Sequence, residues 1–414
     1  MSKGLSRPKN QIRFLLLEGI SPSAVEVLRG NGYDNVEVLP KALEQPALIE
    51  ALKDVQMLGI RSRTQLTDAV LQAAPSVVAV GCFSVGTNQV ELEAAARLGV
   101  PVFNAPFSNT RSVAELTIAE IVMLARGIFA KSTAAHRGEW IKSAAGSREI
   151  RGKTLGIVGY GNIGSQLAVL AEAMGMRVIY FDRTDKLRHG NVEPTDSLGD
   201  LLARADVVSL HLPETAETRG LFDAARIRAM KPGSFLINNA RGSLVDIDAL
   251  AAALRDGHLA GAAVDVFPSE PKSNADPFES PLVGLDNVIL TPHVGGSTEE
   301  AQERIGDEVA RKLVEYSDVG STVGAVNFPQ VQLPKGGSVT RFIQVQRNLP
   351  GELGKLNDLF ARHRLNIAAQ HYQTDGEIGY VVLDAEGEVP NAFDILTEIR
   401  TLPGTIRARL LNRT

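Results

Sequence analysis

Cysteine is nearly absent from this sequence of 414 residues, which contains only Cys82. A single cysteine excludes an intrachain disulfide and favours a reducing compartment, so we expect the protein in the cytoplasm. No apolar stretch approaches the roughly 20 residues that a membrane-spanning helix needs. The net charge of −5 provides no basic field for a polyanion. We therefore expect no nucleic acid and no membrane as partner, and no pattern in the chain predicts a metal site.

Internal repeats and low-complexity tracts are also missing, and the content of 44% hydrophobic and 22% charged residues is that of an ordinary globular protein. The length predicts two or three domains. Short apolar runs at residues 14–17, 36–39, 57–60 and 77–80 alternate with helical patterns, which indicates a parallel sheet with crossover helices. A single long, apolar helix is predicted from Ser112 to about Gly138, with Ser112 and Glu115 as its capping box.

Three glycines lie between a predicted strand and a predicted helix. Glycine permits a tight turn at Gly159, lets a pyrophosphate approach the backbone at Gly161, and allows close packing of helix and strand at Gly164. The helix start adds unpaired N–H groups and a positive dipole end. Asp182 ends a second predicted strand, 18 residues after Gly164 (182 − 164), where a carboxylate binds ribose hydroxyls and repels a 2′-phosphate. This unit predicts NAD, rather than NADP, as the cofactor.

Hydride transfer from an alcohol needs a base for the hydroxyl proton, a cation for the substrate anion, and a group that tunes the base. Open parallel sheets bind ligands outside the carboxyl ends of their strands, so loops that follow strands are the place to search. Arg241, Glu270 and His293 each follow a predicted strand. We predict His293 as the base, Glu270 as the partner that fixes its tautomer and raises its pKa, and Arg241 as the cation that holds the carboxylate and the C2 oxygen.

Two further loops are candidates for binding the substrate. Arg61 and Arg63 follow the predicted strand 57–60, and side chains two positions apart on an extended segment point the same way. That arrangement suits a phosphate at the far end of the substrate, although a solvated basic loop is equally compatible with these residues. The loop that contains Ser84 and Gly86 could offer backbone N–H groups to a carboxylate. A plain surface loop without a ligand is an equally compatible interpretation.

The C-terminal part has a different pattern. Residues 320–337 are rich in glycine and proline and predict a linker. After it, the predicted order is strand, helix, strand, strand, helix, strand. This split βαββαβ unit is too small for an enzyme core but adequate for ligand binding or dimerisation.

Long stretches of the sequence resemble the D-isomer-specific 2-hydroxyacid dehydrogenases that carry a C-terminal ACT domain. They include GIRSRT, GCFSVGTNQV, PVFNAPFSNTRSVAELTIAE and GTIRARLL. The resemblance covers nearly the whole chain and implies an α/β fold. In that fold, a Rossmann NAD-binding domain at residues 109–297 is inserted in a flavodoxin-like substrate-binding domain formed by residues 1–108 and 298–325. A ferredoxin-like ACT regulatory domain at residues 338–414 follows.

The resemblance also implies residue roles. Arg241, Glu270 and His293 match the catalytic set, and Arg61 and Arg63 match contacts of the substrate phosphate. The implied cofactor contacts, together with the glycine turn, are Gly159, Gly161, Asn162, Ile163, Gly164, Asp182, Asn239, Ala240, Arg241, Asp265, His293, Val294, Gly295 and Gly296. The implied contacts of the effector L-serine are Gln346, Asn348 and Asn366. Related sequences often carry His at position 346, and an amide cannot become cationic, so we expect weakened serine binding. Trp140 matches a residue that packs against a neighbouring subunit.

The expected reaction is NAD-dependent oxidation of 3-phospho-D-glycerate to 3-phosphohydroxypyruvate, the first step of L-serine biosynthesis. A homotetramer with feedback inhibition by L-serine is expected, with reduction of 2-oxoglutarate to 2-hydroxyglutarate as a side activity. One alternative is a dehydrogenase or reductase of another D-2-hydroxy acid, related to glyoxylate, D-lactate or 2-hydroxyglutarate. Another is an NAD-sensing protein without turnover, against which the complete Arg–Glu–His set argues.

Overall fold

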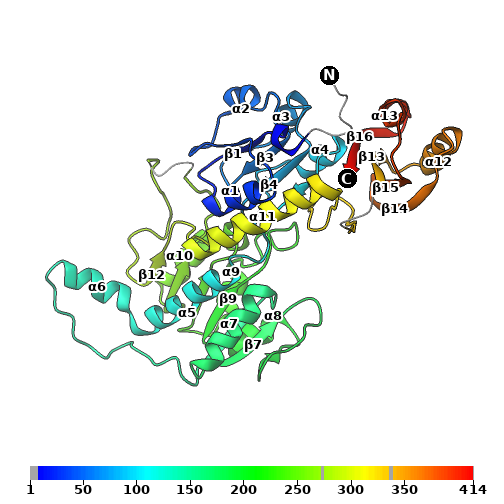
Figure 1. Cartoon of the computed structure of the whole chain (residues 1–414). Coiled ribbons are helices and arrows are strands. Elements are labelled where there is room, and N and C mark those ends of the chain that lie inside the picture. Colours follow the sequence, from blue (N-terminus) through cyan, green and yellow to red (C-terminus); the bar gives the residue numbers. More distant parts are fainter. Residues whose placement is uncertain (1–7, 272–274, 335–338, 414) are drawn as a thin grey trace. The chain divides into compact units, whose positions relative to one another are not determined.

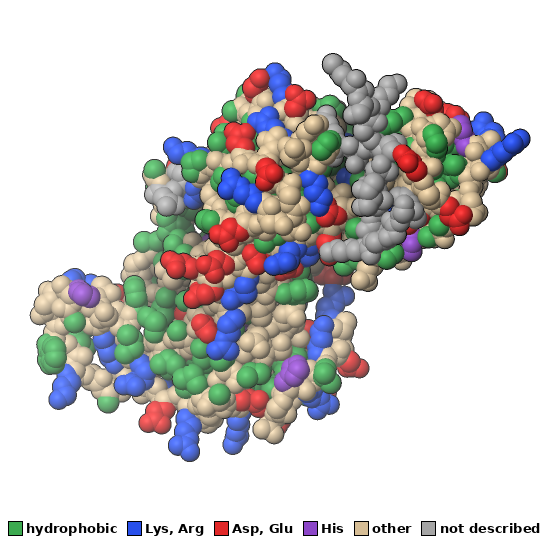
Figure 2. All heavy atoms as spheres, in the orientation of Figure 1, with side chains coloured by type: hydrophobic (Ala, Val, Ile, Leu, Met, Phe, Trp, Pro, Cys, Tyr) green, Lys and Arg blue, Asp and Glu red, His purple; other side chains and the backbone are tan. Residues whose placement is uncertain are grey.

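The computed structural model describes residues 8–271, 275–334 and 339–413 (Figure 1). The chain divides into two compact units, one formed by Met1–Ser108 with Gln302–Thr414 and the other by Asn109–Ala301. Among the helices in the described ranges, none has both the length and the apolar character required to cross a membrane. On the face that Figure 2 shows, Lys and Arg side chains are interspersed with Asp and Glu side chains over both units.

The first unit contains a five-stranded parallel sheet in the order β2-β1-β3-β4-β5. This is the flavodoxin-like order, in which crossover helices cover both faces. The strands are β1 (Phe14–Leu16), β2 (Val36–Val38), β3 (Met57–Ile60), β4 (Ala79–Cys82) and β5 (Val102–Phe103), and the helices between them are α1 (Pro22–Gly30), α2 (Gln45–Ala51), α3 (Asp68–Ala73) and α4 (Leu92–Arg97). β1, β3 and β4 are buried along their whole length, which explains their continuous apolar sequence.

The long helix α11 (Glu299–Val319) also packs on this sheet. Its Val309 and Leu313 are fully buried in the same core cluster as Phe14 and Phe103. This helix is absent from the sequence predictions, although Ile305, Val309 and Leu313 recur at the four-residue spacing of a buried helix face.

The second unit contains a seven-stranded parallel sheet in the order β12-β11-β10-β9-β6-β7-β8. The strands are β6 (Thr154–Val158), β7 (Arg177–Phe181), β8 (Glu193–Pro194), β9 (Val207–Leu210), β10 (Phe235–Asn238), β11 (Gly261–Val264) and β12 (Val288–Leu290), and the helices are α5 (Thr110–Arg126), α6 (Ile128–His136), α7 (Asn162–Ala173), α8 (Leu198–Arg204), α9 (Ala224–Ala229) and α10 (Ile247–Arg255). From β6 the chain proceeds to β7 on one side and later to β9 on the other. The strand order therefore reverses at β6, and this is the crevice where doubly wound sheets bind nucleotides.

The prediction of one helix from Ser112 to Gly138 is wrong. The helix breaks at Gly127, whose φ of +57° lies in the left-handed region, so α5 ends there and α6 begins as a separate helix. The predicted capping box is also wrong, since Ser112 lies inside α5 and its hydroxyl bonds the Thr298 hydroxyl at 2.9 Å. In Figure 1, α6 projects away from the sheet of its unit.

The C-terminal part of the first unit is a four-stranded antiparallel sheet in the order β14-β15-β13-β16. Its elements are β13 (Val339–Arg347), α12 (Glu352–Arg362), β14 (Ile367–Asp375), β15 (Ile378–Glu386), α13 (Ala392–Thr401) and β16 (Thr405–Arg413). Phe342 on one face of the sheet packs on Phe360 of α12 and Ile395 of α13 in a separate core cluster. The predicted βαββαβ order is observed.

The predicted linker is more ordered than its composition suggests. Phe328, Val331 and Leu333 are at most 6% exposed, and they lie in the same core cluster as Phe14 and Ile343. Residues 335–338, the last of the predicted linker together with one residue beyond it, lie outside the described ranges. Burial of these apolar side chains thus orders most of this connection, despite its glycine and proline content.

Buried hydrogen bonds also attach the C-terminal sheet to the rest of its unit. Arg341 is fully buried and makes two bonds of 2.6 Å to the Asp384 carboxylate, and it donates a third, 2.8 Å long, to the carbonyl of Val319. The Tyr380 hydroxyl donates to the carbonyl of Gly320 at 2.6 Å. The end of α11 therefore supplies main-chain acceptors to side chains of the sheet.

Candidate functional site

The turn after β6 has the geometry that a dinucleotide phosphate requires. Gly159 has a φ of +96°, and a Cβ there would lie 2.5 Å from the carbonyl oxygen of His211. A Cβ on Gly164 would lie 2.3 Å from the carbonyl oxygen of Gly159, so helix and turn can approach only without side chains. A Cβ on Gly161 would meet no atom within 4 Å, which leaves open space at the start of α7. The turn fits a pyrophosphate on the helix N-terminus.

Asp182 lies directly after β7 and supports this turn as well as facing it. Its carboxylate accepts a hydrogen bond of 2.9 Å from the backbone N–H of Tyr160 and one of 3.1 Å from that of Thr184. Its neighbour Arg183 is paired with Glu217, so this guanidinium already has an anionic partner. Both members of that pair are exposed, which makes the pair weak. Lys186 also lies near Asp182, with its Nζ atom 3.9 Å from the carboxylate, so the preference for NAD over NADP rests on the negative charge of Asp182 itself.

His293 and Glu270 lie in hydrogen-bond contact at the ends of β12 and β11. The Nδ1 atom of His293 lies 2.9 Å and 3.1 Å from the two carboxylate oxygens of Glu270. The backbone N–H of Phe267 donates to the same carboxylate at 3.1 Å. His293 has a φ of +55°, an unfavourable value for a residue with a side chain. The local fold thus holds the imidazole in a strained position with its Nε2 atom directed away from Glu270.

The carboxylate and the imidazole change each other's proton affinity. The hydrogen bond that His293 donates to Glu270 raises the pKa of His293, and the negative charge of Glu270 adds to this, against the opposing effect of burial. Burial alone would raise the pKa of Glu270, but the hydrogen bond and charge of His293 outweigh it and the pKa falls. An imidazole with a raised pKa is a stronger base once deprotonated, which suits general base catalysis.

Arg241 lies three residues after β10 in the same unit. Burial lowers the pKa of Arg241. Because the ordinary pKa of a guanidinium is very high, the group nevertheless stays charged. Its Nη1 atom donates to the carbonyl of Ala240 at 2.6 Å, and Asn238 donates to the carbonyl of Arg241 at 3.0 Å. Charge attraction from Glu214 and Glu270 also acts on it. A cation and a tuned base therefore follow two strands of one sheet, β10 and β12, with only β11 between them.

The loop that carries His293 is fixed by Asp265, which is buried at the end of β11. Its carboxylate accepts hydrogen bonds of 2.8 Å from the backbone N–H groups of both Val294 and Gly295, and one of 2.6 Å from the Thr291 hydroxyl. A Cβ on Gly296 would clash with Asn109, 2.3 Å away. The structure thus gives Asp265 and the two glycines a supporting role beside the predicted cofactor contact.

The predicted substrate loops belong to the other unit and are held together by two residues that the sequence analysis misses. The carboxylate of Glu18, after β1, accepts from the backbone N–H groups of Arg61, Arg63 and Thr64 at 2.9 to 3.1 Å. Glu18 has a φ of +65°, an unfavourable value. Since it also follows a strand, the rule that finds Arg241 and His293 could have found it.

Gln89 is the second missed residue. Its side-chain amide donates to the carbonyl of Arg61 at 2.5 Å and to the hydroxyl of Ser84 at 3.2 Å. The Ser84 hydroxyl in turn bonds the carbonyl of Gly86 at 2.7 Å. The two candidate loops are therefore one hydrogen-bonded assembly, whose contacts join residues far apart in sequence.

The three predicted effector residues lie in or next to strands of the C-terminal sheet. Gln346 of β13 is fully buried, and within the described part of the chain neither its amide oxygen nor its amide nitrogen has a hydrogen-bond partner. Asn348 is exposed and donates to the carbonyl of Gly376 at 3.0 Å, while Asn366 is exposed just before the edge strand β14. A buried amide without a partner is costly, so Gln346 is a candidate ligand contact.

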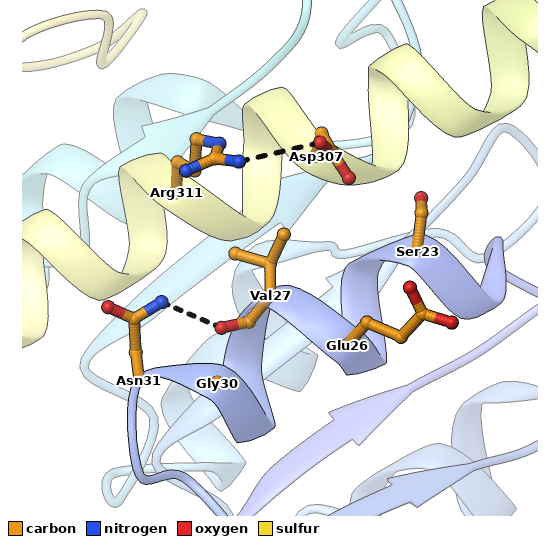
Figure 3. Close-up of a pocket in the computed structure, with 7 residues that line it drawn as sticks. All are labelled: Ser23, Glu26, Val27, Gly30, Asn31, Asp307 and Arg311. Atoms are coloured by element: carbon orange, nitrogen blue, oxygen red, sulfur yellow. Dashed lines mark hydrogen bonds and ion pairs between the residues drawn. The ribbon is translucent and has the colours of Figure 1, made fainter.

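Two surface hollows in the first unit lie apart from these residues. The smaller, of about 340 Å³, lies between α1 and α11 and is lined by polar groups such as Glu26 and Asn31. Figure 3 shows Arg311 paired with Asp307 at 3.6 Å, and Asn31 bonded to the carbonyl of Val27 at 2.7 Å. The residues that line this hollow do not belong to the predicted site.

Comparisons with known proteins agree with this geometry. Residues 118–295 match the family described as D-isomer specific 2-hydroxyacid dehydrogenase, NAD binding domain, and residues 342–407 match the AHAS small subunit-like ACT domain. The chain is 55% identical over 407 residues to the D-3-phosphoglycerate dehydrogenase of Escherichia coli (strain K12), covering 98% of this chain and 99% of that protein. The chain belongs to the D-3-phosphoglycerate dehydrogenase family. Its second unit is the NAD-binding domain of these dehydrogenases.

Other members and more distant structures support the assignment to this dehydrogenase family. The D-3-phosphoglycerate dehydrogenase of Haemophilus influenzae is 54% identical over 411 residues, which is 99% of this chain and 100% of the relative. The crystal structure of D-lactate dehydrogenase from Aquifex aeolicus complexed with NAD and lactic acid superposes with a TM-score of 0.66. It is 27% identical and covers 77% of this chain and 100% of its own, so the fold extends to relatives of other substrate specificity.

Proposed function

We propose that this protein oxidises 3-phospho-D-glycerate to 3-phosphohydroxypyruvate with NAD, which makes it a D-3-phosphoglycerate dehydrogenase acting at the start of L-serine biosynthesis. The observation that carries the proposal is the contact of His293 with Glu270 in the unit that holds the glycine turn. The names of relatives at 54% and 55% identity support the choice of substrate. The experiment is a spectroscopic assay of NADH formation with 3-phosphoglycerate, compared with D-lactate and 2-hydroxyglutarate.

The proposed roles follow from the chemistry of each group. NAD, when bound, accepts the hydride that leaves C2 of the substrate. His293 accepts the proton of the C2 hydroxyl at its Nε2 atom, while Glu270 holds Nδ1–H, fixes the tautomer and stabilises the imidazolium. Arg241 binds the substrate carboxylate and the C2 oxygen, where it opposes the negative charge that develops on that oxygen.

The cofactor contacts and domain limits are proposed in the same way. The glycine turn with Asn162 and Ile163 at the start of α7 holds the pyrophosphate, and Asp182 holds the adenosine ribose. Residues 109–297 form the NAD-binding domain, residues 1–108 with 298–325 the substrate-binding domain, and residues 338–414 the ACT regulatory domain. The remaining proposed cofactor contacts are Asn239, Ala240, Arg241, Asp265, His293, Val294, Gly295 and Gly296.

We propose a homotetramer in the cytoplasm. Trp140, which follows α6, is 87% exposed, and its neighbour Ile141 is 55% exposed, so these two large apolar side chains lack a cover within the described chain. An interface between subunits would cover them. The single buried Cys82 supports a reducing compartment. Reduction of 2-oxoglutarate is proposed as a side activity, since that acid also offers a C2 oxygen and an α-carboxylate.

Arg61 and Arg63 decide between a phosphorylated substrate and a short acid. The double variant Arg61→Ala with Arg63→Ala should raise the KM for 3-phosphoglycerate at least about 100-fold, because charge-assisted bonds to a phosphate contribute about 1.5–3 kcal/mol each. The KM for glyoxylate, which has no second anionic group, should change less than about threefold. Steady-state kinetics with both substrates measure this. Equal increases for the two acids would contradict phosphate binding and favour the alternative of another D-2-hydroxy acid.

L-Serine is proposed as the feedback effector of the ACT domain, bound by Gln346, Asn348 and Asn366. We expect millimolar or lower L-serine to slow NADH formation and to raise the melting temperature. Because histidine can become cationic and glutamine cannot, Gln346→His should lower the serine concentration that gives half inhibition. L-Alanine, which lacks the hydroxyl, is the matched control ligand. Absence of both inhibition and a serine-induced thermal shift would mean that the ACT domain does not bind this effector.

A further inference from the structure

Helix α5 carries a glutamate where a helix packed on a sheet ordinarily has an apolar residue. Glu120 is only 1% exposed, and its Oε2 atom accepts a hydrogen bond of 2.7 Å from the side-chain amide of Asn239. The same amide nitrogen donates to the hydroxyl of Thr117 at 3.0 Å. Since that hydroxyl donates its own proton to the carbonyl of Val113 at 2.8 Å, it can only accept from Asn239. Two acceptors on α5 thus hold one amide.

This arrangement decides how the Asn239 side chain is oriented. Both partners on α5 are acceptors, so the amide nitrogen must face the helix and the amide oxygen must face away from it. That oxygen is buried and has no hydrogen-bond partner within the described residues. Asn239 follows β10 directly and precedes Arg241 by two residues. An acceptor without a partner is therefore fixed at the strand ends where the catalytic set lies.

The same helix also supports the neighbouring loop. The Ser112 hydroxyl of α5 bonds the Thr298 hydroxyl at 2.9 Å, and a Cβ on Gly295 would touch Val113 and Leu116 at 3.7 Å. α5 is thus packed against the ends of both β10 and β12. Its contacts reach the segments that carry Arg241 and His293.

A carboxyl group at this position is costly. Burial raises the pKa of Glu120 to about 7, and the negative charge of Asp265 at the end of β11 adds to the effect, while the bond from Asn239 opposes it. Among the residues that the structure describes, no lysine, arginine or histidine pairs with Glu120. A leucine or methionine would avoid this desolvation, so packing alone does not account for a glutamate here.

We propose that Glu120 is a positioning residue for the cofactor: together with Thr117 it fixes Asn239 so that the amide oxygen accepts a hydrogen bond from NAD. The donor is a carboxamide N–H or ribose hydroxyl of the nicotinamide riboside half, because the proposed catalytic residues Arg241 and His293 require the reacting end of NAD near these strand ends. The choice of the nicotinamide riboside half rests on the proposed function. The test of the inference measures NADH binding, which does not depend on the identity of the substrate.

NADH affinity of the purified full-length chain, measured by fluorescence titration, is the first readout. Glu120→Ala should raise the Kd for NADH about tenfold or more, because the amide loses its charged partner and becomes free to rotate. It should lower kcat while the KM for 3-phosphoglycerate stays within about threefold. Glu120→Gln keeps an oxygen that can accept from Asn239 and should stay within about threefold of the wild-type Kd. Glu115→Gln, an exposed position on the same helix paired with Arg111, should change nothing.

The pH dependence of melting is a second readout, with a definite sign. The pKa of Glu120 is raised from its ordinary value of 4.5 to about 7. Its effect on stability is therefore nil at pH values below 4.5 and becomes increasingly unfavourable as the pH rises to about 7. Relative to the wild type, Glu120→Gln should melt at an equal temperature at low pH and at a higher temperature above pH 7.

A folded Glu120→Ala variant with wild-type NADH affinity would overturn the proposal. If that variant does not fold, Thr117→Val decides, since it removes the second acceptor without leaving a new polar group, and unchanged NADH affinity there would equally overturn it. A wild-type chain that binds NADH but does not oxidise 3-phosphoglycerate contradicts the proposed function and leaves the role of Glu120 standing.

Discussion

Replacing His293 by alanine is expected to lower kcat for the oxidation of 3-phosphoglycerate by about 10²- to 10⁴-fold, the usual contribution of a positioned base. The variant should keep its affinity for NADH, because the glycine turn and Asp182 are untouched. Among the three catalytic candidates, His293 has a carboxylate partner and a raised pKa, as a general base requires. Steady-state kinetics combined with a fluorescence titration of NADH measure both quantities.

Glu270→Gln is the matched control for that assignment. Oxidation needs the neutral imidazole, so the rate falls as the pH drops through the pKa of His293. Glu270 raises this pKa. Loss of its charge should therefore move the acidic limb of the pH–kcat profile to lower pH and lower the maximum rate. Near-normal turnover of His293→Ala, or a limb that does not move in Glu270→Gln, would exclude His293 as the base.

Replacing Asp384 by asparagine is expected to destabilise the ACT domain by about 3–5 kcal/mol, because it leaves Arg341 as an uncompensated buried charge. Both side chains are almost fully buried, at 1% and 7% exposure, and they make two bonds of 2.6 Å. Urea unfolding, followed by circular dichroism, measures the loss as a lower midpoint.

An exposed pair provides the control for this prediction. Glu50→Gln removes an ion pair with Lys53 whose side chains are 71% and 68% exposed, and it should change the free energy of unfolding by less than about 0.5 kcal/mol. Equal effects of the two substitutions would mean that the Arg341–Asp384 pair stabilises no more than a surface pair. It would also mean that Arg341 is held mainly by the carbonyl of Val319.

Much of the catalytic geometry follows a rule that is readable in sequence. A buried parallel strand is a short apolar run, and the residue types that follow it reach one edge of the sheet. Arg241, Glu270 and His293 were selected by this rule, and the structure brings the last two into contact. The glycine turn is equally readable in the sequence: the backbone leaves no room for a Cβ at Gly159 and Gly164, while Gly161 leaves open space for a ligand.

The remaining features depend on contacts between residues distant in sequence. Glu18 bonds the loop around Arg63, 45 positions away, and Glu120 bonds Asn239, 119 positions away. The sequence alone does not distinguish either glutamate from one on the surface, because tertiary packing determines what surrounds each side chain. The break at Gly127 was missed for a local reason, since an apolar helical pattern continues across it and a glycine inside a helix costs only about 1 kcal/mol.

The way in which the ACT sheet is attached bears on how such modules are exchanged. Four side chains of the described part of the sheet donate to main-chain carbonyls of the rest of the unit: Arg341 to Val319, Tyr380 to Gly320, Arg407 to Val77 and Arg409 to Tyr316. A main-chain carbonyl is present whichever amino acid occupies the position. The accepting residues of the rest of the unit can therefore be substituted without loss of these hydrogen bonds. Exchange of the regulatory module therefore requires these four donors together with the apolar side chains, such as Ile343 and Val382, that share the core of the first unit.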